Sequence, residues 1–254
     1  VWINYARCHD DIGWGFENQI IRELGMDPEA HKQFMIQFME GKYPGSFSRG
    51  ELYEFNPETL DARNSGTMAS MCGLEEAVCE KDRYKLELSV KRILLLNSVI
   101  ISYTGIPLLY SGDELGQLNW WEYKNDPEIA HDSRWLHRPP MDWDKAEHRD
   151  DQGTVEGIIF NRIKEMISIR KSHDVFASTL HSIPVDTGNK GVFAFHKEDK
   201  MLVLANFTEK EQVVDCNRVN WFGLPWEMHD LIQGKSVRLW ENIVLGPYEY
   251  LWLV

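Results

Sequence analysis

The sequence contains no apolar run long enough to cross a membrane. Its longest apolar stretch, around Ile93 to Ile101, is interrupted by Asn97 and Ser98, whereas a transmembrane helix needs about 20 consecutive apolar residues. No secretory signal peptide is visible at the start of the chain. Because the chain begins inside a strand-like segment and lacks an initiator methionine, we expect its natural N-terminus to lie upstream. The localisation is therefore left open, with the cytoplasm favoured.

Cysteine is scarce and widely spaced. No two of the four cysteines are close enough to form a zinc module or a dense disulfide framework; they are Cys8, Cys72, Cys79 and Cys216. This spacing indicates ordinary reduced thiols. Since Cys72 and Cys79 have no histidines at ligand spacing, we expect neither a metal site nor a cofactor.

Basic residues are also few relative to acidic ones. The 254 residues include 27 Lys and Arg against 40 Asp and Glu, which gives a formal net charge of −13. A nucleic acid would favour a basic stripe, and no cluster of Lys and Arg would supply one. We therefore expect neither nucleic acid nor a membrane as a partner. Tryptophan, by contrast, is abundant, and the ten indole rings can fill a core or stack on the apolar faces of sugars.

Strand-like and helical patterns alternate over the first two thirds of the chain. The helical pattern, with apolar residues at three- and four-residue steps, is clearest from Thr154 to His173. The expected elements are a strand at 1–7, a mainly irregular stretch at 12–80 with one helix at 27–40, a helix at 82–105, a strand at 106–112, an irregular loop at 117–143 and a helix at 154–173. This order is typical of the end of an alternating β/α array.

A different pattern begins near residue 174. The segments "GVFAFHKEDKMLVLANF" and "SVRLWENIVLGPYEYLWLV" predict an antiparallel β-sandwich domain over 174–254. The preceding 173 residues hold only two β/α units, whereas a closed barrel needs eight units and about 250 residues. The expected fold class is therefore α/β plus all-β: the C-terminal portion of a (β/α)8 TIM barrel over 1–173, followed by the β-sandwich.

A polar triplet, His9-Asp10-Asp11, ends the first strand-like segment in "NYARCHDDIGWGF". Taken alone, the triplet fits an active-site edge, a metal site or a polar turn, because a single short motif also occurs by chance. A metal-dependent hydrolase would require further clustered His and Asp ligands, and the sequence shows none. The other two interpretations remain open from the residues alone.

Several motifs in fixed order resemble the α-amylase superfamily, glycoside hydrolase family 13, and within it the amylosucrases. The matching segments are "NYARCHDDIGW", "GSFSRG", "FNPETLDARNSGT", "GIPLLYSGDELG", "DSRWLHRP", "HDLIQGK" and "LGPYEYLWLV". The resemblance implies that the chain holds barrel strands 7 and 8 with their helices, a loop domain inserted at about 12–80, and the C-terminal β domain at 174–254. It also implies that the nucleophilic aspartate and the acid/base glutamate lie upstream of Val1.

The resemblance assigns roles to five residues of this chain. Asp10 matches the carboxylate that stabilises the transition state, and His9 matches the histidine that donates to the same sugar. Asp11 and Arg63 match the pair that contacts the fructosyl ring of sucrose. Arg134 matches the arginine that closes the glucosyl pocket by pairing with an aspartate from an early strand. The alternatives without a catalytic role are a capped turn for His9 and Asp10 and a solvated loop arginine for Arg63.

Three positions depart from the amylosucrase pattern. Lys32 stands where an acceptor-side arginine is usual, and lysine cannot reproduce the planar guanidinium fork. His131 replaces a common aspartate before "DSRW", and Glu54 stands in place of an amide. The donor side of the site therefore matches the family, while the acceptor side is altered.

The resemblance implies a C-terminal part of a retaining enzyme that cleaves sucrose and transfers glucose to an α-glucan, releasing fructose. Its partners would be sucrose, α-glucan or other saccharides, and the upstream part of the same protein; the chain alone would be inactive. The alternatives within the superfamily are a sucrose hydrolase, a trehalose-forming isomerase, or another α-glucosidase or α-amylase. From a different class, the chain could be a non-catalytic carbohydrate-binding module.

Overall fold

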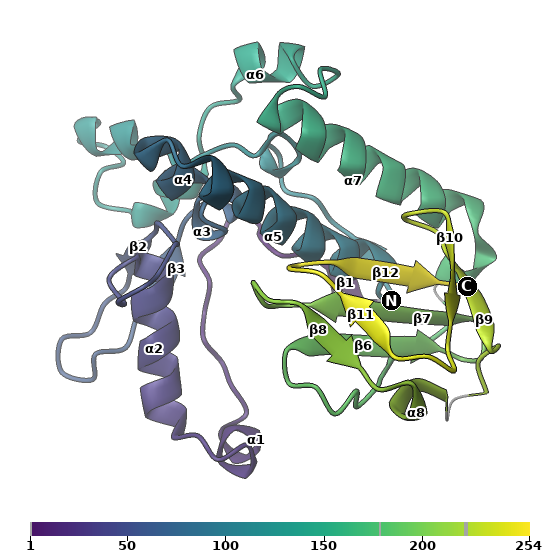
Figure 1. Cartoon of the computed structure of the whole chain (residues 1–254). Coiled ribbons are helices and arrows are strands. Elements are labelled where there is room, and N and C mark those ends of the chain that lie inside the picture. The colour runs from purple at the N-terminus through teal and green to yellow at the C-terminus, as the bar shows by residue number, and fades with distance from the viewer. Residues whose placement is uncertain (1, 178, 221–222) are drawn as a thin grey trace. The chain divides into compact units, whose positions relative to one another are not determined.

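A computed structural model of the chain (Figure 1) describes residues 2–177, 179–220 and 223–254. The described residues form two compact units. Unit 1 contains residues 1–6, 91–108 and 149–254, and unit 2 contains residues 7–90 and 109–148. Helix α5 (Arg83–Ser102) contributes residues to both units. The expected boundary near residue 174 stays a prediction.

In unit 1, two short parallel strands lie side by side. Strand β1 (Ile3–Asn4) pairs with β4 (Ile106–Pro107), with Ile3 opposite Ile106. Both strands are shorter than the sequence pattern predicts, because only these residues pair with a neighbouring strand. Ile3 and Ile106 are more than half exposed, although parallel sheets are normally covered on both faces. The described strands of this sheet thus leave apolar residues uncovered.

Two long helices confirm the helical predictions closely. Helix α5 (Arg83–Ser102) follows Asp82, whose carboxylate accepts from the backbone N–H of Tyr84 at 2.9 Å. Helix α7 (Val155–Ser172) follows Thr154, whose hydroxyl oxygen accepts from the Gly157 N–H at 3.1 Å. Such side-chain caps satisfy backbone donors that the first helical turn leaves free. A short 3₁₀ turn, η4 (Asp174–Phe176), comes directly after α7.

The rest of unit 1 is an antiparallel β module, as predicted. A six-stranded sheet has the order β10-β9-β12-β7-β6-β5, and a second pair joins β11 to β8. The strands are β5 (Ile183–Pro184), β6 (Val192–Lys197), β7 (Met201–Asn206), β8 (Gln212–Val214), β9 (Glu227–Asp230), β10 (Lys235–Arg238), β11 (Ile243–Leu245) and β12 (Tyr250–Leu253). One short helix, α8 (Cys216–Val219), lies between β8 and β9.

The two sheets of this module share one apolar core. Leu204 of β7 lies opposite Leu251 of β12, and both side chains pack in one cluster with Val214 and Leu245 of the smaller sheet. All four are at most 1% exposed. The segments "MLVLANF" and "YEYLWLV" supply core residues, which confirms the prediction made from their pattern.

Unit 2 corrects the expectation that residues 12–80 are mainly irregular. The predicted helix is present as α2 (Pro28–Glu40), but five further elements surround it: α1 (Asn18–Glu23), β2 (Glu51–Tyr53), β3 (Arg63–Ser65), α3 (Met68–Met71) and α4 (Leu74–Glu80). These elements are too short to show a reliable period in sequence. Hydrogen bonds complete them: β2 and β3 pair as antiparallel strands, and the hydroxyl of Thr67, directly before α3, caps that helix.

The loop predicted at 117–143 is also more regular than expected. It contains the 3₁₀ helices η2 (Trp121–Asn125) and η3 (Ser133–His137), and α6 (Trp143–Glu147) begins at its end. Another 3₁₀ turn, η1 (Asp113–Leu115), comes just before it. The prolines lie between these turns rather than inside them, so they separate the elements instead of preventing them.

The four cysteines are free thiols. Within the described residues, no helix combines the length and apolarity that crossing a bilayer requires.

Candidate active site

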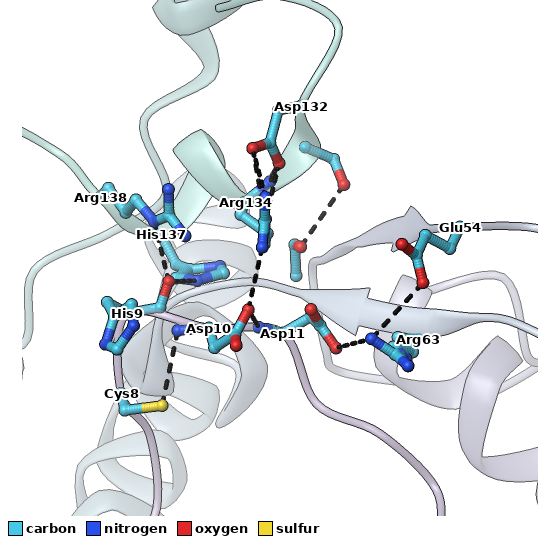
Figure 2. Close-up of polar contacts among 12 residues, drawn as sticks. Cys8, His9, Asp10, Asp11, Glu54, Arg63, Asp132, Arg134, His137 and Arg138 are labelled. Atoms are coloured by element: carbon cyan, nitrogen blue, oxygen red, sulfur yellow. Dashed lines mark hydrogen bonds and ion pairs between the residues drawn. The ribbon is translucent and has the colours of Figure 1, made fainter.

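Asp10 is held by two donors in the turn that follows β1 (Figure 2). Its Oδ1 accepts from the backbone N–H of Asp11 at 3.1 Å and from Nη1 of Arg134 at 3.2 Å. Both bonds lower the pKa of Asp10 below its usual range, and the bond from the Asp11 N–H has the larger effect. The carboxylate is therefore a fixed negative charge at neutral pH, and half of it remains open to solvent.

Asp11 lies next to Arg63, as the sequence predicts. Its side chain is only 6% exposed, and its Oδ2 lies 3.6 Å from Nη1 of Arg63. Burial raises the pKa of Asp11, the neighbouring Asp10 raises it further, and Arg63 opposes both effects. The same Arg63 nitrogen lies 3.4 Å from Oε2 of Glu54. One guanidinium is thus placed between two carboxylates.

The inserted segment fixes Arg63 through its neighbour, Asn64. Backbone hydrogen bonds join Ile12 to Asn64 in both directions, at 2.8 and 3.0 Å. The fully buried Asn64 side chain accepts from Nε1 of Trp14 at 2.7 Å and donates to the Ile36 carbonyl at 3.1 Å. Since Ile12 directly follows Asp11, this pairing sets the position of Arg63 relative to the His9-Asp10-Asp11 turn.

Arg134 is anchored within its own 3₁₀ turn. Its Nε lies 3.0 and 3.2 Å from the two oxygens of Asp132, and its Nη2 lies 2.9 Å from Oδ2. The guanidinium also stacks over the Tyr53 ring at 4.7 Å. Among the described residues, the carboxylate partners of Arg134 are Asp132 and Asp10; the pairing with an aspartate from an early strand stays a prediction. The bond to Arg134 lowers the pKa of Asp132.

His9 is held through its backbone. Its carbonyl oxygen accepts from Nε of Arg138 at 2.8 Å and lies 3.1 Å from Nε2 of His137. In Figure 2 the His9 ring and the Arg63 guanidinium lie on opposite sides of Asp10. The structure therefore brings His9, Asp10, Asp11, Arg63 and Arg134 together in unit 2, as expected.

Sequence reasoning missed three residues of this site: Asp132, His137 and Arg138. All three lie in or next to the segment "DSRWLHRP" that was singled out for Arg134 alone. The only signal was the density of charged and imidazole side chains in eight residues. Their partners are more than a hundred positions away for His137 and Arg138, so spacing along the chain could not reveal them.

A buried charged pair of residues lies in the same unit. Burial raises the pKa of Asp113 to about 7, although Arg7 opposes the shift. Burial also lowers the pKa of Arg7, whose Nε and Nη2 have no hydrogen-bond partner among the described residues. Glu114, next to Asp113, accepts from the backbone N–H of Gly112 at 2.8 Å and so fixes the start of η1.

Two of the three positions that depart from the family pattern, Lys32 and Glu54, form ion pairs. Lys32 forms an ion pair with Asp61 at 2.7 Å, so its charge is compensated within the inserted segment. His131 is exposed. Across the described part of the chain, no three His, Cys, Asp or Glu side chains are grouped in a way that could hold a metal ion. The ion pairs of the site join the carboxylates of Asp10, Asp11 and Asp132 to the guanidinium groups of Arg63 and Arg134.

Comparisons with known proteins place the chain in a broader context. No family model matches it. It is 21% identical over 257 residues to glucosylglycerate phosphorylase of Escherichia coli K12, an alignment that covers 99% of this chain and 41% of the relative. This chain thus spans about two fifths of the length of the curated relative it matches.

Solved structures give the fold comparison. A crystal structure of AmyP with maltotriose has a TM-score of 0.51 at 18% identity and covers 65% of this chain and 35% of AmyP. A structure of MutB with sucrose has a TM-score of 0.48 at 18% identity and covers 64% of this chain and 38% of MutB. The sequence resemblance to the α-amylase superfamily is thus accompanied by a similarity in fold to AmyP over 65% of the chain.

Proposed function

We propose that this chain, which resembles the C-terminal part of α-amylase superfamily enzymes, belongs to a longer retaining enzyme that acts on α-glucosides. The observation that carries the proposal is the fixed, ionised carboxylate of Asp10 beside Asp11, Arg63 and Arg134. Retaining glycosidases pass through a transition state with positive charge at the anomeric carbon. A preorganised carboxylate stabilises such charge more strongly than mobile water does.

Each residue of the site has a defined role in this proposal. Asp10 faces the glucosyl ring and stabilises its developing positive charge, while the His9 imidazole donates to hydroxyls of the same ring. Arg134 keeps Asp10 ionised and closes the floor of the glucosyl pocket. Asp11 and Arg63 hold the leaving group through charge-assisted hydrogen bonds. The nucleophile and the acid/base come from strands of the upstream polypeptide.

The uncovered face of the parallel strand pair supports the involvement of a longer chain. Trp2, Ile3, Tyr5, Ile106 and Leu108 are 40–80% exposed on or beside β1 and β4. Parallel sheets occur almost only with both faces covered, and a two-stranded sheet is at best marginally stable by itself. Further parallel strands, as in a (β/α)8 barrel, would cover these residues and complete the sheet.

We further propose that the substrate is sucrose and that glucose passes to an α-glucan, releasing fructose, as in amylosucrases. The charges around Arg63 support a neutral leaving group, because Asp11 and Glu54 flank its single positive charge. An anionic leaving group would meet two carboxylates against one guanidinium. Lys32, paired with Asp61, stands where amylosucrases usually have an arginine on the acceptor side. Short saccharides or water are therefore also suitable acceptors.

A second candidate is phosphorolysis of an α-glucoside. The similarity to glucosylglycerate phosphorylase over nearly the whole chain favours it. Phosphate would then take the place of the sugar acceptor, and the product would be a glucose phosphate. The charges at Glu54 and Asp11 argue against glycerate as the leaving group, so the two candidates predict different substrates as well as different products.

Product analysis of the complete reading frame tests these proposals. The purified enzyme would be incubated with sucrose, with and without glycogen-like α-glucan, and with sucrose or glucosylglycerate plus inorganic phosphate. Fructose release without phosphate, with longer glucans or free glucose as the second product, supports the leading proposal. A phosphate-dependent glucose phosphate supports the second candidate. Inactivity on every α-glucoside, with α-glucan binding by the protein, would instead indicate a carbohydrate-binding module.

A further inference from the structure

We infer that His137 is a positioning residue that fixes the peptide group between His9 and Asp10, an inference that rests on the proposed role of Asp10. The carbonyl of His9 belongs to the same peptide unit as the backbone nitrogen of Asp10. A donor on that carbonyl therefore sets the orientation from which the Asp10 side chain leaves the backbone. Nε2 of His137 lies 3.1 Å from this oxygen.

The other ring nitrogen defines the tautomer. Nδ1 of His137 accepts from the backbone N–H of Gly66 at 3.2 Å. A nitrogen that accepts carries no proton, so the proton of the neutral ring lies on Nε2 and is donated to the His9 carbonyl. The ring thus transmits the position of Gly66, one residue after β3, to the turn that carries Asp10.

The surroundings keep this ring neutral. His137 is only 1% exposed, and burial lowers its pKa to about 3, with Arg7 and Arg138 acting in the same direction and the His9 carbonyl and Asp10 opposing. A protonated ring would have two donors, and its Nδ1–H would face the Gly66 N–H. Protonation would therefore break one of the two bonds on which the positioning depends.

Both ends of this connection are rigid. At Gly66 a Cβ atom would lie 2.9 Å from Cε of Met71 and 3.3 Å from the Arg49 carbonyl oxygen, so the backbone there is closely packed. On the other side, His137 ends η3, whose first residue, Ser133, donates to the Leu52 carbonyl at 2.9 Å. A shift of either support would move the ring and, with it, the His9 carbonyl.

The short 3₁₀ helix η3 therefore contacts both the side chain and the backbone of the turn that carries Asp10. From η3, Arg134 contacts the Asp10 carboxylate itself, and His137 contacts the backbone that carries it. Arg138, directly after η3, donates to the same His9 oxygen at 2.8 Å. Arg134 acts on the charge of Asp10, whereas His137 acts on its placement. Since a misplacement of about 1 Å can cost about 10²-fold in rate, placement alone has a measurable effect.

Substitutions in the complete polypeptide separate positioning from general stability. His137→Leu removes both hydrogen bonds at similar volume, His137→Gln keeps a neutral donor and acceptor at similar reach, and His137→Asn is shorter by one carbon. We expect kcat on the α-glucoside that the wild type turns over to fall about 10–100-fold in the Leu and Asn variants, with KM changed about threefold or less. The Gln variant should recover most of kcat. His229→Gln, on an exposed position of β9, is the matched control.

The outcomes distinguish the inference from the proposed function. If a folded Leu or Asn variant keeps the wild-type kcat, or if Gln is as impaired as Asn, the inference is wrong. If the Leu variant fails to fold, the Gln and Asn comparison still decides. Nitrogen NMR of ring-labelled histidine gives a readout that needs no activity: we expect a neutral ring with the proton on Nε2 at pH 7. A proton on Nδ1 would overturn the inference, whereas this tautomer in a protein inactive on every α-glucoside would contradict only the proposed function.

Discussion

Two neighbouring carboxylates, Asp10 and Asp11, have their pKa values shifted in opposite directions by their surroundings. Asp10 is exposed to solvent and accepts from the Asp11 N–H and from Arg134, which lowers its pKa. Asp11 is buried beside that negative charge, which raises its pKa. Environment thus separates two chemically identical groups, as it commonly does at catalytic sites. Asp10 is suited to stabilise positive charge, and Asp11 to accept or share hydrogen bonds with a neutral polyol.

A substitution at Glu54 tests the proposed preference for a neutral leaving group. Glu54→Gln removes one of the two carboxylates beside Arg63 while keeping the size of the side chain. In the complete enzyme we expect the ratio of kcat/KM for glucosylglycerate to that for sucrose to rise about 2–5-fold, since a surface ion pair of this kind contributes up to about 1 kcal/mol. Initial rates on both substrates measure it. Glu58→Gln, on the same loop, is the control, and an unchanged ratio would remove Glu54 from the account of specificity.

The sequence predicted the residues that carry the proposed chemistry but not those that hold them. Resemblance to a known family was enough to identify Asp10, Asp11, Arg63 and Arg134 from the sequence. His137 contacts a residue 128 positions away, and no local pattern encodes such a contact. Glu54 was recognised only as a departure from the family; its pairing with Arg63 became visible in the structure.

Among the helices and strands, the long ones with a repeated apolar pattern could be predicted from the sequence, and the short ones could not. Helices α5 and α7 and strands β6 and β7 each repeat their apolar period often enough to be read from the sequence. The short elements α1, α3, α4, β2 and β3 contain only three to seven residues each, too few to repeat a pattern, and contacts with other segments complete them. Residues whose structure depends on distant partners, such as Asn64, cannot be assigned from their neighbours.

The cap of α2 gives a test at this scale. Asp27 accepts from the Ala30 N–H at 2.8 Å, so Asp27→Ala leaves that donor to water. We expect a loss of about 1 kcal/mol in the free energy of unfolding, measured by urea denaturation and by faster amide exchange in the first turn of α2. Asp27→Asn retains an accepting oxygen and should stay within a few tenths of a kcal/mol of the wild type. Equal losses in both variants would show that the cap is not the cause.

Asp113, in η1, should make stability depend on pH. Its pKa is raised by burial from 3.8 to about 7, so the folded state binds the proton more tightly than the unfolded state. The stabilisation is complete below about pH 4 and is lost as the pH rises toward 7. Relative to Asp113→Asn, the wild type should therefore lose on the order of 2–4 kcal/mol between pH 4 and 8, since one pKa unit equals about 1.4 kcal/mol.

Urea unfolding of both proteins at several pH values measures this difference. The comparison isolates Asp113, because all other titrating groups are shared by the two proteins. Asp144→Asn, at an exposed position, serves as the control for the loss of a surface carboxylate. A difference between wild type and Asp113→Asn that stays constant from pH 4 to 8 would show that Asp113 does not titrate in this range.

In the proposed function, the catalytic groups are divided between this chain and the rest of a longer polypeptide. The chain spans 41% of the relative it matches, and the apolar residues beside β1 and β4 are uncovered. Asp10 can stabilise positive charge, but one carboxylate cannot also form the glycosyl-enzyme bond and protonate the leaving group. We therefore expect the isolated chain to release no fructose from sucrose above background, even when folded.

The most direct test of the central claim is the rate of sugar release by the complete enzyme with Asp10 and with Asp10→Asn. The amide keeps the shape of the side chain and removes its charge. We expect kcat to fall about 10²–10³-fold, which corresponds to a loss of about 3–4 kcal/mol of transition-state stabilisation, while the isolated chain stays inactive in the same fructose assay. An Asn variant as fast as the wild type, or robust turnover by the isolated chain, would contradict the role assigned to Asp10.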